Sequence, residues 1–113
     1  MPASPVDPDF LARTRDSFAR QAVMATLGIT LEQAEPGAVR LAMAHRADLT
    51  QQHGFLHAGI VATALDSACG YAAFTLMPAE AAVLTVEFKI NLMAPARGPL
   101  FRFVGQVVKA GRT

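Results

Sequence analysis

One carboxylate lies inside a long run of small and apolar residues, where an acid is not expected. The run extends over residues 53–77 (HGFLHAGIVATALDSACGYAAFTLM), and Asp66 is its only acid. A carboxylate in such surroundings must be paired with another group, be neutralised by a proton or serve a function, because its removal from water is costly. Apolar surroundings also make a carboxylate more basic, which suits a general base or a nucleophile. Asp66 is therefore the first catalytic candidate; the alternative is a structural acid that is hydrogen-bonded to backbone or to Thr85.

The other residues with reactive side chains form no recognisable metal site. His45, His53 and His57 lack the spacing of metal ligands, and we expect neither a metal nor a cofactor. Cys69, the only cysteine, follows Asp66 by three residues. We expect it to be a buried core residue and not a catalytic nucleophile. A single cysteine excludes an internal disulfide and fits a reducing compartment.

The element that carries Asp66 is predicted to be a central helix. About 20 residues of helix are about 30 Å long, and the small residues on all its sides indicate a helix that is buried. A membrane span is disfavoured, since Asp66 lies near the centre and no basic residue lies close to either end.

Four strands are predicted around this helix, two before it and two after it. Ile29–Glu35 and Ala38–Ala44 are separated by a Pro-Gly turn, and Val83–Leu92 has the clearest alternation of apolar and polar residues. The last strand is Leu100–Lys109, with Gly105 as a candidate β-bulge. The order predicts an α+β fold in which an antiparallel sheet curls around the helix. Four strands are few to enclose such a helix, so one or two strands are expected to be missing.

The chain is predicted to contain one domain, residues 28–113, after an N-terminal segment, residues 1–27. That segment carries a one-sided surface helix over Asp9–Met24, with Pro8 before its start and Gly28 after its end.

Composition narrows the class of protein. The 113 residues are 52% apolar and 17% charged, typical of a folded globular chain. A net charge of +1 gives no reason to expect a nucleic-acid partner. The N-terminus, MPASPVDPDF, lacks the basic and apolar regions of a signal peptide. We therefore expect a cytoplasmic protein that does not enter the membrane.

Three sequence blocks together resemble a known family. HGFLHAGIVATALDSACGYAA, LTVEFKINLMAPARG and VVKAGRT occur in the order and at the separation of the hotdog-fold acyl-CoA thioesterases of the phenylacetate-degradation (PaaI-like) branch. The nearest subgroup is the bacterial medium/long-chain acyl-CoA thioesterases. The resemblance covers residues 28–113 and implies hydrolysis of a fatty acyl-CoA to a free fatty acid and CoA. It also implies a homodimer or homotetramer with active sites at the dimer interface.

The resemblance assigns roles to individual residues. Asp66 would act as general base or nucleophile, the backbone N–H of Ala58 would polarise the thioester oxygen, and Thr85 would face the acid. Gln51, with Gln52 as the alternative, would contact substrate or water; His57 would fix the helix start or act as a base. The expected substrate-binding residues are Gly59 and three basic residues that either contact the phosphates of CoA or form a solvated edge: Arg97, Lys109 and Arg112.

The family usually continues past the Gly-Arg-Thr block through at least one more strand, so the resemblance predicts a C-terminally truncated chain. Two other functions stay open at this point. One is a non-catalytic hotdog protomer that binds acyl-CoA or a partner subunit. The other is a hotdog hydratase that acts on enoyl or hydroxyacyl thioesters, which is less favoured because only His57 is available as its base.

Overall fold

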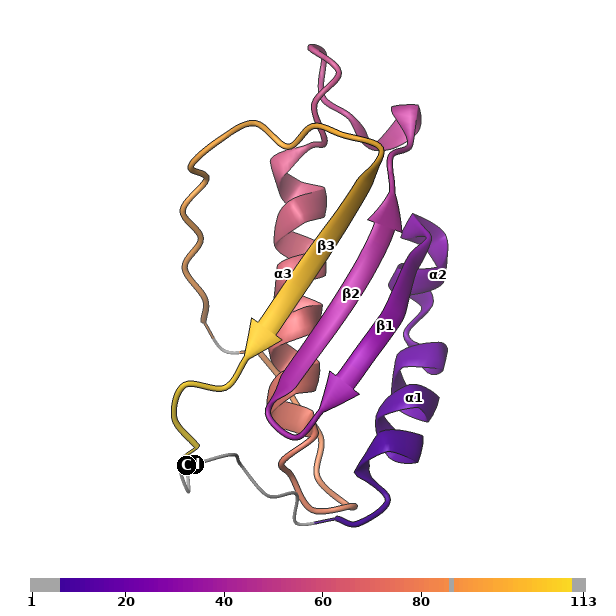
Figure 1. Cartoon of the computed structure of the whole chain (residues 1–113), viewed down its shortest axis with the longest axis vertical. Coiled ribbons are helices and arrows are strands. Elements are labelled where there is room, and N and C mark those ends of the chain that lie inside the picture. Colours follow the sequence, from indigo (N-terminus) through magenta and orange to yellow (C-terminus); the bar gives the residue numbers. More distant parts are fainter. Residues whose placement is uncertain (1–6, 86, 111–113) are drawn as a thin grey trace.

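A long helix lies against one face of a small antiparallel sheet. The structure, a computed structural model, describes residues 7–85 and 87–110. Its sheet has the strand order β1-β2-β3, and helices α1, α2 and α3 cover the same face of it (Figure 1). The predicted α+β architecture, a long helix on an antiparallel sheet, is confirmed. The elements are α1 (Phe10–Arg20), α2 (Ala22–Leu27), β1 (Ile29–Glu35), β2 (Ala38–Ala44), a 3-10 turn η1 (Ala47–Leu49), α3 (Ala58–Phe74) and β3 (Leu100–Gln106).

The β1–β2 hairpin forms where the alternation predicted it. Gly37 adopts a positive φ of 81° in the connecting turn, a conformation that glycine reaches without strain. Val39, Leu41 and Met43 of β2 are all buried under α3 and its neighbours. These residues form the centre of the core, together with Met24, Leu27, Ile29, Leu56, Ala64, Ala68, Tyr71, Ala72, Phe74 and Phe103.

The predicted bulge at Gly105 is wrong. Gly105 pairs in regular register with Val39, and the irregularity of the sheet lies in β1, between Leu31 and Gln33. Gly105 instead allows β3 to approach α3 closely, because a Cβ there would overlap the Ala68 carbonyl and lie 2.6 Å from Cys69 N.

The single helix predicted over Asp9–Met24 is two helices. The chain breaks at Gln21, whose ψ of 97° is extended, and α2 then ends at Gly28 in the left-handed region, as predicted. Gln21 does not continue the helix; its side chain accepts a hydrogen bond of 3.1 Å from Ser67 Oγ of α3. Helix α1 is thereby held against α3 rather than lying free on the surface.

Arg13 fixes α1 across the C-terminal end of α3. Its Nη2 donates to the carbonyl oxygens of Phe74 (3.1 Å) and Met77 (2.8 Å), and its Nε pairs with Asp7 at 2.8 Å. The guanidinium carbon also lies 4.1 Å from the centroid of the Phe74 ring. A cation at this position stabilises the unpaired carbonyls of a helix end.

The third predicted strand, Val83–Leu92, has no ladder partner among the described residues. It runs beside α3 and apart from β3 (Figure 1), with Leu84 88% exposed. The alternation predicts a strand with one apolar side, but a strand also needs a neighbour to accept its backbone hydrogen bonds. The three-stranded sheet therefore covers one side of α3 instead of wrapping it, and Cys69, expected in the core, is exposed. The last strand ends at Gln106, not at Lys109.

Within residues 7–85 and 87–110, no helix has both the length and the hydropathy that a membrane crossing requires.

Candidate active site

Asp66 and Thr85 meet, a contact that fits both the role implied by the resemblance and the structural alternative for Asp66. Thr85 Oγ1 donates a hydrogen bond of 2.8 Å to Asp66 Oδ1. Asp66 is half-buried on α3, whereas Thr85 is exposed on the extended segment that follows the helix. The second carboxylate oxygen, Oδ2, makes no hydrogen bond with any residue that the structure describes. One oxygen is thus held in place while the other is available to a water molecule or a substrate.

A cavity of about 560 Å³ opens beside this pair, and we refer to it as the Asp66 cavity. Three elements build it: α3 forms its floor, the extended residues 82–85 form one wall and the end of α1 forms the other. The α1 wall could not be predicted from the sequence, since the docking of α1 depends on the Arg13 contacts and not on a local pattern. The cavity is lined by Ser17, Arg20, Gln21, Asp66, Ser67, Gly70, Tyr71, Phe74, Ala82, Val83, Leu84 and Thr85.

His57 caps the start of α3. Its backbone is extended (φ −61°, ψ 136°), and its Nδ1 accepts a hydrogen bond of 2.8 Å from the Gly59 N–H. A Cβ on Gly59 would lie 3.0 Å from the same Nδ1, so glycine leaves room for the ring. This geometry favours a structural role for His57 over a role as general base. The hydrogen bond to His57 also occupies the N–H of Gly59.

Ala58 is the first residue of α3, and its N–H has no partner within residues 7–85 and 87–110. A free N–H at a helix start is a preorganised donor for developing negative charge, and the helix dipole adds to its effect. Ala58 lines a second cavity of about 480 Å³ together with Gln51 and Phe55. We call this the Gln51 cavity.

Gln51 shapes the loop before α3. Its side-chain oxygen accepts hydrogen bonds from the N–H groups of His53 (2.6 Å) and Phe55 (3.3 Å). The carbonyl oxygen is therefore occupied by the loop, and the amide nitrogen is the part of Gln51 that remains for a ligand. Gln52 is exposed and does not line either cavity.

A single protomer does not bring the two halves of the expected site together. Ala58 and Asp66 are eight residues apart on one helix, which separates them by about 12 Å along its axis. They line different cavities, so one chain does not place the Ala58 N–H and the Asp66 carboxylate in the same cavity.

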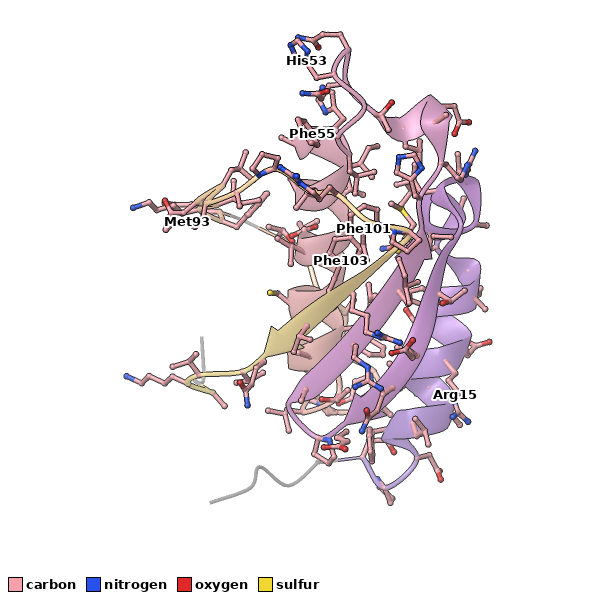
Figure 2. The ribbon with its side chains drawn as sticks, turned by 45° about the horizontal axis from the view of Figure 1, so that its top comes forward. Arg15, His53, Phe55, Met93, Phe101 and Phe103 are labelled. Atoms are coloured by element: carbon pink, nitrogen blue, oxygen red, sulfur yellow. The ribbon has the colours of Figure 1, made fainter. Side chains whose placement is uncertain are left out.

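The predicted basic residues have different positions. Arg97 lines a third cavity of about 430 Å³ together with His45 and His53, and its guanidinium carbon lies 5.3 Å from the centroid of the Phe55 ring. His53 and Phe55 project from the loop that precedes α3, at one end of the molecule (Figure 2). Lys109 is exposed beyond β3 and lines none of these three cavities. Arg112 lies outside the described residues.

Metal and thiol chemistry gain no support from the geometry. The described part of the chain contains no group of three or more His, Cys, Asp and Glu side chains that could hold a metal ion. Partial burial raises the pKa of the Cys69 thiol, and the nearby negative charge of Asp66 raises it further. Cys69 therefore stays a protonated thiol near neutral pH, which is a poor nucleophile.

Comparison with known proteins gives the family of this chain. The family model for the Thioesterase superfamily matches residues 53–113, more than half of the chain. The chain belongs to the thioesterase superfamily. A candidate esterase of Halobacterium salinarum is 33% identical over 96 residues, a match that covers 80% of this chain and 63% of that protein. The chain thus spans less than two thirds of that relative.

Solved structures agree with this family. A thioesterase family protein from Silicibacter pomeroyi has 63% sequence identity and a TM-score of 0.90, over 92% of this chain and 76% of that one. The PaaI protein of Escherichia coli, from the phenylacetic acid degradation operon, has a TM-score of 0.82 at 19% identity, over 92% of this chain and 74% of that one. At that identity the likeness concerns the fold alone, and the fold is the hotdog fold, as the sequence blocks implied.

Proposed function

We propose that the chain is an acyl-CoA thioesterase, which hydrolyses medium- or long-chain fatty acyl-CoA to a free fatty acid and CoA. The observation that carries the proposal is the Asp66 carboxylate, held on one oxygen by Thr85 and facing a cavity. Membership in the thioesterase superfamily supports the reaction type.

The reaction needs a base and a donor on the two sides of the thioester. In the proposed mechanism, Asp66 takes a proton from water while the water oxygen attacks the thioester carbonyl carbon. The carbonyl oxygen gains negative charge and accepts a hydrogen bond from the Ala58 N–H. The tetrahedral intermediate then collapses, the carbon–sulfur bond breaks, and the CoA sulfur leaves with the proton from Asp66. Direct attack by Asp66, followed by hydrolysis of the mixed anhydride, is the alternative order of steps.

We propose further that two protomers build each active site. The donor and the carboxylate of one chain are too far apart along α3 to reach one carbonyl. A two-fold pair that places the Ala58 end of one α3 beside Asp66 of the other creates two equivalent sites. The enzyme would then be a homodimer, or a homotetramer made of such dimers.

The phosphates of CoA would bind near the start of α3. The Gln51 cavity and the third cavity, which Arg97 lines, share Phe55, so they lie next to each other. Arg97 would bind phosphate through its planar guanidinium, with His45 and His53 beside it. Lys109 and Arg112 are further candidates for binding the phosphates of CoA.

The test is release of free CoA thiol from acyl-CoA substrates of increasing length and from phenylacetyl-CoA. Asp66→Asn keeps an oxygen for Thr85 but removes the base, so turnover should fall about 10²- to 10⁴-fold. Ala58→Pro removes the donor alone, and kcat should fall about 10²- to 10³-fold. Proline is well accepted as the first residue of a helix, and the extended backbone of His57 suits a following proline.

Cys69→Ser is the matched control, because it changes an exposed side chain of the same helix and should keep wild-type turnover. A folded wild type that releases no thiol from any substrate would overturn the proposal in favour of a non-catalytic acyl-CoA-binding protomer. The hydratase alternative is weakened because the Nδ1 of His57, the base it would need, is engaged by the Gly59 N–H.

A further inference from the structure

We propose that the side-chain amide nitrogen of Gln21 donates a hydrogen bond to the water molecule that Asp66 activates, which makes Gln21 a water-positioning residue of this site. The reaction of that water rests on the proposed function. Gln21 belongs to the N-terminal segment, residues 1–27, and therefore lies outside the part of the chain that carries the family resemblance.

The chain places Gln21 between two helices. It is the residue after α1 and the residue before α2, with an extended ψ of 97°. A polar side chain at this position often caps the helix that follows, but Gln21 makes no such hydrogen bond. Its Oε1 instead accepts a hydrogen bond of 3.1 Å from Ser67 Oγ of α3. Ser67 is 7% exposed and directly follows Asp66 in the sequence, so the amide of Gln21 is fixed beside the neighbour of the proposed base.

Gln21 and Asp66 each keep one polar atom free. Nε2 of Gln21 makes no hydrogen bond within residues 7–85 and 87–110, and neither does Oδ2 of Asp66. Both residues line the Asp66 cavity. An amide nitrogen is a donor and a carboxylate oxygen is an acceptor. The cavity therefore offers a water molecule one donor and one acceptor at the same time.

The cavity also has the room that a bound water needs. Its volume of about 560 Å³ far exceeds the roughly 30 Å³ that a water molecule occupies in the liquid. When the water oxygen accepts from Gln21 Nε2 through one lone pair and donates one proton to Asp66 Oδ2, its second lone pair remains free to attack the thioester carbonyl carbon. The two hydrogen bonds thus fix the direction of the attack, which is a recognised source of rate acceleration.

The docking of α1 on α3 does not by itself require an amide at this position. The hydroxyls of Ser17 and Tyr71 lie 3.2 Å apart and join the same two helices. Ser17 precedes Gln21 by four residues, and on α3 Ser67 precedes Tyr71 by the same number. The two contacts are therefore neighbours along the helices. A hydroxyl is enough to join α1 to α3, whereas Gln21 brings a second polar group, its amide nitrogen, to the cavity.

The decisive variants are Gln21→Glu and Gln21→Met, measured by release of CoA thiol. Gln21→Glu keeps an oxygen for Ser67, but its side chain, ionised at neutral pH, cannot donate to water. Gln21→Met removes both the donor and the acceptor. Because the donor contacts the water and not the substrate, kcat should fall roughly 10- to 100-fold in both variants, while KM stays within about twofold of wild type.

Phe18→Leu is the matched control, because it weakens the docking of α1 without touching the cavity. The Phe18 ring lies 5.7 Å from the Tyr71 ring, between centroids, and Phe18 does not line the Asp66 cavity. This variant should melt at a lower temperature than wild type but keep kcat and KM within about twofold. An equal loss of kcat in Phe18→Leu and in the two Gln21 variants, or a wild-type kcat in Gln21→Glu, would overturn the proposal.

A crystal structure of the wild type separates this inference from the proposed function. It should contain a water molecule within about 3.2 Å of both Gln21 Nε2 and Asp66 Oδ2, and the structure of Gln21→Met should lack this water. If the water is present but no acyl-CoA is hydrolysed, the proposed function fails and the water site stands. If the water is absent from the wild type, the assignment of Gln21 fails, whatever the turnover.

Discussion

Gly105 and Gly70 show that the same substitution has opposite consequences on two elements that pack together. A Cβ on Gly105 would overlap the backbone of α3 at Ala68, whereas a Cβ on Gly70 would make an ordinary contact. We predict that Gly105→Ala lowers the free energy of unfolding by about 1–3 kcal/mol, because β3 must move away from α3. Gly70→Ala should leave it unchanged or raise it by up to about 1 kcal/mol. Urea denaturation followed by circular dichroism measures both, and equal effects would contradict this account of Gly105.

The sequence predicts individual site residues where their type is unusual for their surroundings. Asp66 is conspicuous as the only acid of an apolar helix, and the alternation of residues 83–92 puts Thr85 on the polar face. Ser17 and Gln21 could not be predicted, because they reach the cavity only through the docking of α1. That docking depends on contacts between residues about 60 positions apart, such as Arg13 with Phe74 and Met77. No local pattern encodes such contacts.

At the scale of elements, the outer face of the sheet is linked across its strands by one acid. Glu32 of β1 accepts a hydrogen bond of 2.9 Å from Arg102 Nε of β3. Arg40 Nε of β2 lies 2.6 Å from the same carboxylate oxygen but makes no hydrogen bond among the described residues. Arg102, and then the charge of Arg40, hold the pKa of Glu32 below its ordinary value of 4.5.

This shift predicts how the stability of the sheet depends on pH. Because the pKa of Glu32 is lower in the folded state, its contribution is fully present above the ordinary carboxyl pKa and is lost as the pH falls through the folded value. The wild type should therefore be more stable than Glu32→Gln at pH 7, and the difference should vanish in acid and shrink at high salt. Thermal melts of both proteins from pH 7 downwards measure it. Glu80→Gln is the control, since Glu80 is exposed and forms no ion pair with the residues that the structure describes. A difference that is constant with pH would contradict the prediction.

The elements themselves differ in how far the sequence predicts them. The hairpin β1–β2 and helix α3 are predictable because their backbone hydrogen bonds join residues that are close in the chain. Residues 83–92 have the strongest strand pattern, yet pairing is not a local property, and the described residues offer them no ladder. Leu84, Phe88 and Leu92 are consequently all exposed.

At the scale of the whole molecule, the two halves of the proposed site are separated by the length of half a helix. Each protomer has a donor at the start of α3 and a carboxylate in its middle, and each half has its own cavity. If two protomers share their active sites, the mixing of two inactive variants has an expected outcome that differs from that for independent monomers. Two variants that are each inactive should restore activity when they are combined in one dimer.

We predict this complementation for Asp66→Asn and Ala58→Pro. In a mixed dimer, one site combines both defects and the other combines an intact Asp66 with an intact Ala58 N–H. Each mixed dimer has one complete site out of two, so mixed dimers selected through two different tags should regain about half of wild-type activity. Co-expression with two different tags, purification over both, and release of CoA thiol measure the result. Pairing Asp66→Asn with the Asp66→Asn/Ala58→Pro double variant is the control, because no complete site can form in that dimer. If the first pair regains no more activity than the control, then the donor and the carboxylate do not come from different protomers, and the site must be sought within one chain.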